Sequence, residues 1–170
     1  MVGIPGSVGG AVVMNAGGKY GQIGDVVKSV RVITRDGRIK TVNKIRFAYR
    51  WSNLKGELLA EVTLQLKPST LIAVSSRIKA ILNEKKQTQP LADWSAGCVF
   101  TNPVHYSAGA LIDKAGLKGL TIGGAKISTK HANFIVNTGK AKARDVLKLI
   151  DIIKKTIRKK FNIDLQLEIE

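Results

Sequence analysis

Residues Met1–Asp25 read MVGIPGSVGGAVVMNAGGKYGQIGD, and their glycine content raises the first question about the fold. Eight of these residues are glycine, which either supplies the positive φ of a tight turn or lets the backbone approach a ligand closely. The stretch lacks the Lys-Ser/Thr pair of a P-loop, and no strand precedes it as in a Rossmann fingerprint. A ligand-lining backbone and a compact, turn-rich segment both stay open. A flexible leader is disfavoured by the apolar residues between the glycines, which are Ile4, Val8, Val12, Val13 and Met14.

The composition is that of an ordinary globular protein, with 44% hydrophobic and 24% charged residues in a chain of 170. This length allows one domain or two small ones. No apolar run reaches the roughly 18 residues of a membrane span, and no signal-peptide pattern is present. The single cysteine, Cys98, excludes an internal disulfide framework and suits a reducing, cytoplasmic setting. Together with His105 and His131 it offers too few ligands for a structural zinc site, so no metal is expected.

The net charge of +16 raises the question of nucleic-acid binding. The excess of cations occurs on both sides of Pro68, with 11 Lys/Arg against 4 Asp/Glu before it and 17 against 8 after it. Aromatic residues make up only 5% of the chain, which is poor material for stacking on bases. Spread charge and few aromatics disfavour a nucleic-acid partner and favour an anionic small substrate or a generally basic proteome.

The first part of the chain is predicted to be mainly β. Residues Val26–Val42 alternate apolar and polar side chains around Asp36-Gly37, a strong hairpin signal. Residues Gly56–Pro68 indicate a further strand that ends at the proline.

The second part mixes helices with strands. Helical spacing and serine caps predict a helix from Ser75 to Gln89, and a short helix follows over Ser107–Gly119. The clearest helix covers Lys142–Phe161, with cations near its C-terminus, where the helix dipole favours them. Alternation over 163–169 indicates a final strand. The sequence thus predicts an α+β fold, with a boundary between residues 1–68 and 69–170.

Six stretches, in order and spacing, resemble UDP-N-acetylenolpyruvoylglucosamine reductase, also called UDP-N-acetylmuramate dehydrogenase. This family comprises flavoenzymes of bacterial peptidoglycan synthesis. Nothing is inserted between Arg50 and Ser95, as in its shorter type. The stretches are GIPGSVGGAVVMNAGG (Gly3–Gly18), FAYRWS (Phe47–Ser52), QPLADWSAGCVFTNP (Gln89–Pro103), AGALIDKAGLKG (Ala108–Gly119), GGAKISTKHANFIVN (Gly123–Asn137) and LQLEIE (Leu165–Glu170).

The resemblance implies that residues 1–68 are the second half of an FAD-binding domain and 69–170 a smaller, α+β substrate-binding domain. It implies FAD as cofactor, NADPH as co-substrate and UDP-N-acetylglucosamine enolpyruvate as substrate. Family members carry a further FAD-binding segment before the glycine-rich motif, whereas only Met1 and Val2 precede it here. Three alternatives stay open: a separate N-terminal FAD-binding segment is a partner of this chain, the start codon is misplaced, or the segment is lost. The residues implied to face FAD are Gly6, Ser7, Gly10, Ala11, Asn15 and Gly17.

Three residues match the catalytic positions of the family. Arg50 corresponds to an arginine that polarises the enolpyruvyl carboxylate, because a guanidinium stays charged and donates two parallel hydrogen bonds. Cys98 stands where most members have a proton-donating serine, and a thiol is a stronger acid than an alcohol. Glu168 matches the last glutamate of the family's C-terminal motif. A surface arginine, a small buried cysteine and a solvent-facing carboxylate are the ordinary alternatives.

Tyr49 and Asn102 match positions that contact the substrate in the family. A second function stays open beside the reductase, namely a truncated, non-catalytic remnant that binds UDP-sugar or an anionic partner. A functional flavin-binding segment upstream of Met1 would favour the enzyme over the remnant.

Overall fold

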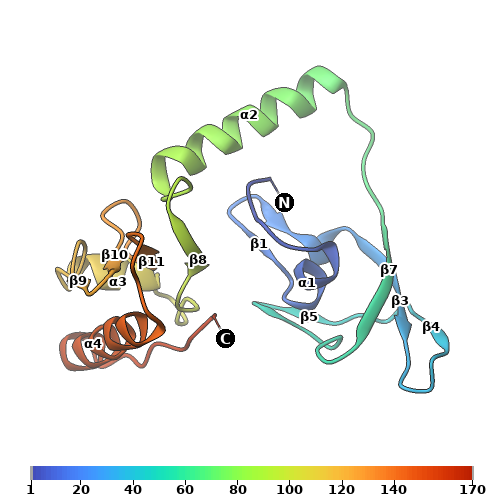
Figure 1. The fold of residues 1–170 in the computed structure, drawn as a ribbon. Coiled ribbons are helices and arrows are strands. Elements are labelled where there is room, and N and C mark those ends of the chain that lie inside the picture. The colour runs from blue at the N-terminus through green and yellow to red at the C-terminus, as the bar shows by residue number, and fades with distance from the viewer. Residues whose placement is uncertain (1, 170) are drawn as a thin grey trace. The chain divides into compact units, whose positions relative to one another are not determined.

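The computed structural model describes residues 2–169 and divides into two compact units, Met1–Leu82 and Asn83–Glu170 (Figure 1). The two units mix helices with antiparallel sheets, so the predicted α+β class is confirmed. The predicted boundary after Pro68, between an FAD-binding and a substrate-binding domain, stays a prediction. Within the described residues, no helix combines the length and apolar character that crossing a bilayer requires.

Unit 1 is built on a three-stranded antiparallel sheet. The strands are β3 (Val27–Ile33), β4 (Ile39–Val42) and β7 (Leu58–Leu64), in the order β4-β3-β7. β3 and β4 form the predicted hairpin around Asp36-Gly37, and β7 confirms the strand predicted before Pro68. One face of the sheet is buried at Val30 and Val32 because α1 and the segment around it cover that face.

The glycine-rich segment contains a short helix that the glycine spacing hid. Ser7 caps α1 (Val8–Val13) by accepting a hydrogen bond from the Gly10 amide at 3.1 Å. Two-residue strands β1 (Gly17–Gly18) and β2 (Gly21–Gln22) and the 3-10 helix η1 (Ile23–Asp25) follow. Val12 is fully buried, so packing on the sheet stabilises a helix that glycine alone disfavours. The buried core of unit 1 consists of Val12, Ile23, Val30, Val32 and Leu54.

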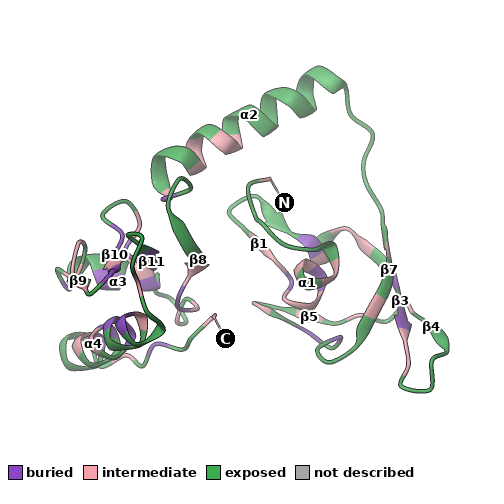
Figure 2. Cartoon of the chain, in the orientation of Figure 1, coloured by how far each residue is buried: buried purple, intermediate pink, exposed green. Residues whose placement is uncertain are grey.

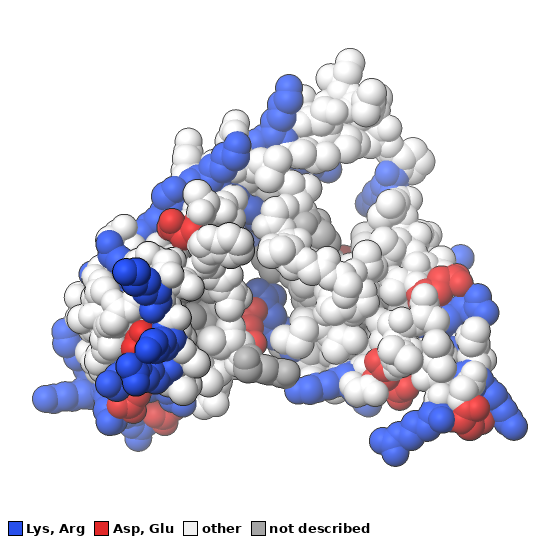
Figure 3. Space-filling view, viewed as in Figure 1, with Lys and Arg blue, Asp and Glu red and all other residues white. Residues whose placement is uncertain are grey.

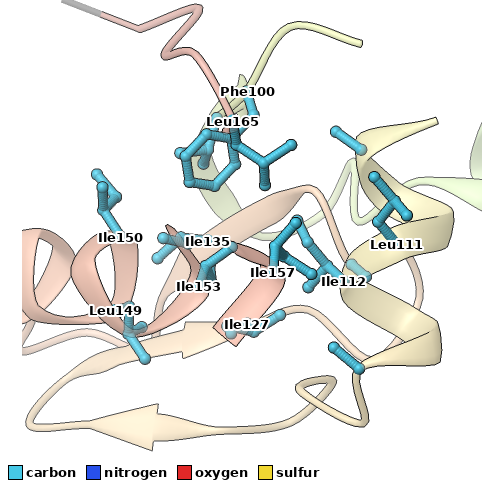
Figure 4. Close-up of a cluster of buried hydrophobic side chains, with 14 of the residues drawn as sticks. Phe100, Leu111, Ile112, Ile127, Ile135, Leu149, Ile150, Ile153, Ile157 and Leu165 are labelled. Atoms are coloured by element: carbon cyan, nitrogen blue, oxygen red, sulfur yellow. The ribbon is translucent and has the colours of Figure 1, made fainter. Parts of the chain in front are cut away.

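Unit 2 contains a four-stranded antiparallel sheet covered by helices. Its order is β8-β11-β10-β9, from β8 (Trp94–Cys98), β9 (Thr121–Ile122), β10 (Ala125–Ile127) and β11 (Phe134–Asn137). Helix α4 (Ala143–Phe161) packs against β9, β10 and α3 (Ala108–Lys114). Figure 4 shows apolar side chains of these helices and strands gathered in one cluster.

Helix α4 forms as its sequence predicts. Leu149, Ile150, Ile153 and Ile157 recur at helical spacing and are buried. Asp145 closes a capping box at the N-terminus, and Asn162 ends the helix in the left-handed conformation with a φ of 57°. Cations in the last turn complement the helix dipole.

Helix α2 (Leu71–Thr88) begins four residues before the predicted start at Ser75. The cap is the hydroxyl of Thr70, which accepts a hydrogen bond from the Ala73 amide at 3.2 Å, and not a serine. None of the residues of α2 is buried, as Figure 2 shows along its length.

The prediction of a continuous final strand over 163–169 is wrong. Leu165 is fully buried in the core, but a single isolated bridge, Phe100 with Leu167, is the strand-like pairing within the described part of this segment. The alternating apolar residues therefore anchor an extended segment instead of a continuous ladder.

Replacing Ile157 by alanine is expected to destabilise unit 2 by about 3 kcal/mol, because it leaves a cavity where α4 packs into the hydrophobic core of this unit. Ile157 is 0% exposed. The free energy of unfolding in urea, followed by circular dichroism, measures the loss. Leu147→Ala on the same helix is the control, because Leu147 is 62% exposed and its truncation leaves no cavity. Equal stability of both variants would contradict the packing described.

Acid is expected to weaken unit 2 through Asp145. Backbone N–H groups of Lys142 (3.0 Å) and Gly124 (3.3 Å) donate to its carboxylate, and the Lys142 bond is the main cause that lowers the pKa of Asp145. A carboxyl with a lowered folded pKa stabilises the fold above the unfolded pKa of about 4, and this stabilisation is lost as the pH falls through the folded pKa.

Asp145→Asn should therefore show a smaller loss of unfolding free energy between about pH 7 and about pH 3 than the natural chain. Asp151→Asn is the matched control, because Asp151 lies exposed on α4 and makes a surface ion pair with Lys155. An unchanged acid dependence in Asp145→Asn would show that this cap does not couple to protonation.

Candidate active site

Arg50 lies in the two-residue loop of a small hairpin in unit 1. Strands β5 (Phe47–Ala48) and β6 (Trp51–Ser52) pair through Ala48 and Trp51, which leaves Tyr49 and Arg50 as the loop. Arg50 has a φ of 53°, a region that residues other than glycine rarely adopt. Its guanidinium carbon lies 4.9 Å from the centre of the Tyr49 ring, a cation–π contact.

Two buried side chains tie this hairpin to the segment that ends α1. The amide nitrogen of Asn15 donates to the carbonyl of Ala48 at 2.9 Å, and the hydroxyl of Ser52 donates to the carbonyl of Val13 at 2.8 Å. Asn15 is 1% exposed and Ser52 0% exposed. The loop that carries Arg50 is therefore held on both of its strands.

The start of the glycine-rich segment presents an open backbone. Gly6, Ser7 and Gly10 are all exposed. A Cβ added at Gly6 would meet nothing within 4 Å, and one at Gly10 would meet the Ser7 hydroxyl alone, at 3.3 Å. Backbone that is bare on this side is accessible to a large planar or phosphate-bearing group, and contact of these residues with FAD stays a prediction.

The other three residues predicted at the cofactor also serve the interior of unit 1. Ala11 packs against its hydrophobic core, and the Asn15 side chain is hydrogen-bonded within the unit. A Cβ on Gly17 would lie 2.5 Å from the Cα of Gln22, so glycine is required for β1 to pair with β2. Their contact with FAD stays a prediction.

Cys98 ends strand β8 in unit 2, where it pairs with Phe134 of β11. The preceding residue, Gly97, has a φ of 85°, which a side chain at this position would disfavour. Cys98 is half-buried as a residue and forms no disulfide. Cys98 is thus partly exposed at the end of an edge strand, and its role as a proton donor stays a prediction.

Glu168 lies on the segment next to Cys98. Its amide donates to the carbonyl of Val99 at 2.9 Å, and the Thr101 amide donates to the carbonyl of Gln166 at 3.0 Å. Unit 2 thus brings two of the three predicted catalytic residues onto neighbouring, antiparallel segments. Asn102, predicted to contact substrate, is exposed, and its side-chain Oδ1 accepts from the Ala108 amide at the start of α3.

Asn133 is a supporting residue to which the sequence assigned no role. Its side chain accepts from the amide of Phe100 at 3.0 Å and donates to the carbonyl of Phe100 at 2.7 Å, so both polar groups of that peptide are held. Nearby, burial lowers the pKa of His131, and the positive charge of Lys118 adds to this effect. A neutral His131 accepts from the Asn133 amide through Nδ1 at 3.3 Å. Phe100 and Asn133 are 33 positions apart, so sequence spacing could not reveal their contact.

A pocket of about 300 Å³ lies in unit 2. Its lining includes Trp94, Val99, Lys142 and Ile169 but neither Cys98 nor Glu168. The pocket therefore does not contain the two predicted catalytic residues of unit 2. Within residues 2–169, no group of three His, Cys, Asp or Glu side chains gathers as metal ligands would.

The basic charge is distributed over both units. On the face shown in Figure 3, Lys and Arg side chains occur on each unit with acidic side chains among them. Several cations are paired, as in Arg31 with Glu61 and Arg158 with Asp164, both at 2.8 Å.

Two family models match the chain. Residues 89–170 match the C-terminal domain of UDP-N-acetylenolpyruvoylglucosamine reductase, and residues 1–43 match an FAD binding domain. A crystal structure of UDP-N-acetylenolpyruvylglucosamine reductase from Thermus caldophilus is similar, with a TM-score of 0.85 and 40% identity. The match covers 99% of this chain and 61% of that chain.

Curated relatives agree with this match. A UDP-N-acetylenolpyruvoylglucosamine reductase of Moorella thermoacetica is 47% identical over 99% of this chain and 57% of the relative. The chain thus spans little more than half the length of that relative. A reductase sequence of Bacillus licheniformis is 44% identical, and 94% of it is covered. With this identity over nearly a whole relative, the chain belongs to the UDP-N-acetylenolpyruvoylglucosamine reductase family.

Proposed function

We propose that this chain supplies the second part of an FAD-binding domain and the substrate domain of a reductase. That enzyme would use NADPH to reduce UDP-N-acetylglucosamine enolpyruvate to UDP-N-acetylmuramate for peptidoglycan synthesis. The observation that carries the proposal is the hydrogen bond from the Glu168 amide to the carbonyl of Val99, the neighbour of Cys98, in a chain that belongs to this family. An N-terminal FAD-binding segment would complete the enzyme.

Each side chain has a distinct task in this proposal. Arg50 binds the substrate carboxylate and stabilises the negative charge that develops there. Glu168 acts on the same developing charge. Cys98 donates the proton from Sγ to the carbon next to that carboxylate. Tyr49 and Asn102 orient the substrate.

The exposed start of the glycine-rich segment would hold the cofactor, through the open backbone at Gly6 and Gly10 and the hydroxyl of Ser7. When bound, FAD reduced by NADPH supplies the hydride. The same segment is held in place by the packing of Ala11, the hydrogen bonds of Asn15 and the close strand pairing at Gly17.

The test joins this chain to the N-terminal part of the Moorella thermoacetica relative that lies outside the matched region. NADPH oxidation should then require UDP-N-acetylglucosamine enolpyruvate, with a product two hydrogens heavier. The added N-terminal part alone is the control and should show no such oxidation. An assembly that holds FAD at one per chain and binds the substrate but leaves it unreduced would contradict the proposal. It would favour a non-catalytic UDP-sugar-binding protein.

A further inference from the structure

We propose that Asn15 and Ser52 are positioning residues for Arg50, acting as a clamp on the β5–β6 hairpin. The Asn15–Ser52 clamp denotes these two side chains and their hydrogen bonds to Ala48 and Val13. This inference rests on the proposed function of Arg50. It assigns Asn15 a task in addition to its predicted place near the cofactor.

The side chain of Asn15 bonds to two segments that are distant in sequence, the stretch Gln22–Gly24 and β5 at Ala48. Its amide nitrogen donates to the Ala48 carbonyl at 2.9 Å and to Gln22 Oε1 at 2.8 Å. Its Oδ1 accepts from the Gly24 amide at 3.1 Å. Both N–H donors and the oxygen of this buried amide are thereby used, and an apolar side chain in its place would supply none of these bonds. One residue thus fixes β5 relative to the turn that follows β2.

Close packing at Gly24 strengthens the same contact. A Cβ on Gly24 would lie 2.7 Å both from Asn15 Oδ1 and from Cγ of Phe47, the first residue of β5. The absence of a side chain therefore lets η1 lie directly against Asn15 and the hairpin.

Ser52 holds the opposite strand of the hairpin. Its hydroxyl donates to the Val13 carbonyl at 2.8 Å and accepts from the Leu54 amide at 3.3 Å, in a position with no exposed surface. The carbonyl of Val13 lies at the end of α1, where helical carbonyls lack partners within the helix. The bonds of Asn15 and Ser52 thus connect β5 and β6 to the same short stretch, Val13–Asn15.

Between Ala48 and Ser52, the two hairpin residues that these bonds hold, lie only Tyr49, Arg50 and Trp51. Arg50 adopts its φ of 53° within this short span, and such a conformation persists when the surroundings impose it. A guanidinium that must meet a carboxylate with two parallel bonds tolerates little displacement, so loss of either anchor should reduce the rate of reaction. The clamp therefore couples the segment after α1 to the orientation of Arg50.

The first experiment measures hydrogen exchange in the chain itself. Asn15→Leu and Ser52→Ala should speed exchange of residues 47–52 by at least about tenfold more than exchange of β3, because buried hydrogen bonds to the hairpin are lost. Val30→Ala is the control, since Val30 is buried in β3 and donates nothing to the hairpin. It should speed exchange in both regions by a similar factor. Equal acceleration of both regions in all three variants would overturn the clamp.

The second experiment uses the enzyme assembled with an N-terminal segment. Asn15→Leu should lower kcat about tenfold or more while KM for the UDP-sugar changes little. In the Arg50→Lys background it should lower kcat no further, because the clamp acts through Arg50. Additive losses in the double variant would overturn the assignment. If Arg50→Lys is fully active while the exchange result holds, the clamp stands and the proposed role of Arg50 fails.

Discussion

Replacing Cys98 by alanine is expected to slow reduction of the enolpyruvyl substrate by about 10²- to 10⁴-fold in the assembled enzyme, the usual effect of losing a positioned general acid. Cys98 ends an edge strand beside the segment that carries Glu168, and the residue is half-buried. The step in which NADPH reduces the flavin should keep its rate, because that step needs no proton donor to the substrate. Rapid mixing resolves the two half-reactions.

Cys98→Ser is the matched control for this prediction. A serine hydroxyl has nearly the same reach as the thiol, and the family resemblance places serine at this position in most members. Much of the lost rate should therefore return. If the alanine variant reduces the substrate as fast as the natural chain, Cys98 is a small interior residue and not the proton donor.

Changes at Arg50 and Glu168 are expected to have the next largest effects. Arg50→Lys should lower kcat by about 10²- to 10³-fold, because an ammonium cannot reproduce two parallel hydrogen bonds to a carboxylate. Glu168→Gln should also lower kcat more than it weakens binding of the UDP-sugar, as expected for a contact that strengthens in the transition state. Steady-state kinetics with the assembled enzyme measure both.

The combined variant tests whether the two residues act on one charge. If they do, Arg50→Lys with Glu168→Gln should cost less in rate than the product of the single losses. Tyr106→Phe, at an exposed residue outside the proposed site, is the control and should leave kcat unchanged. A neutral Glu168→Gln together with a fully active Arg50→Lys would show that the family roles do not apply here.

Local patterns predicted two of the periodic elements correctly. The β3–β4 hairpin follows from Asp36-Gly37 between alternating runs, and α4 from its apolar stripe. Helix α1 was missed because glycines weaken helical propensity, whereas burial of Val12 against the sheet supplies what propensity lacks. The terminal segment alternates like a strand, yet the backbone pairs through a single bridge.

The candidate site divides in the same way. Resemblance to the family pointed to Arg50, Cys98 and Glu168, but spacing could not reveal what holds them. Asn15 bonds to Ala48 across 33 positions of sequence, and Asn133 to Phe100 across another 33. Such partners are set by tertiary packing and not by any local period.

A single-turnover experiment determines whether this chain carries the substrate-reducing half of a flavin-dependent reductase. The assembled enzyme is reduced with one equivalent of NADPH without oxygen and then mixed with UDP-N-acetylglucosamine enolpyruvate. The absorbance of oxidised flavin is expected to return fully, with one UDP-N-acetylmuramate formed per flavin. Flavin that stays reduced while the UDP-sugar is bound would rule out the proposed reductase function.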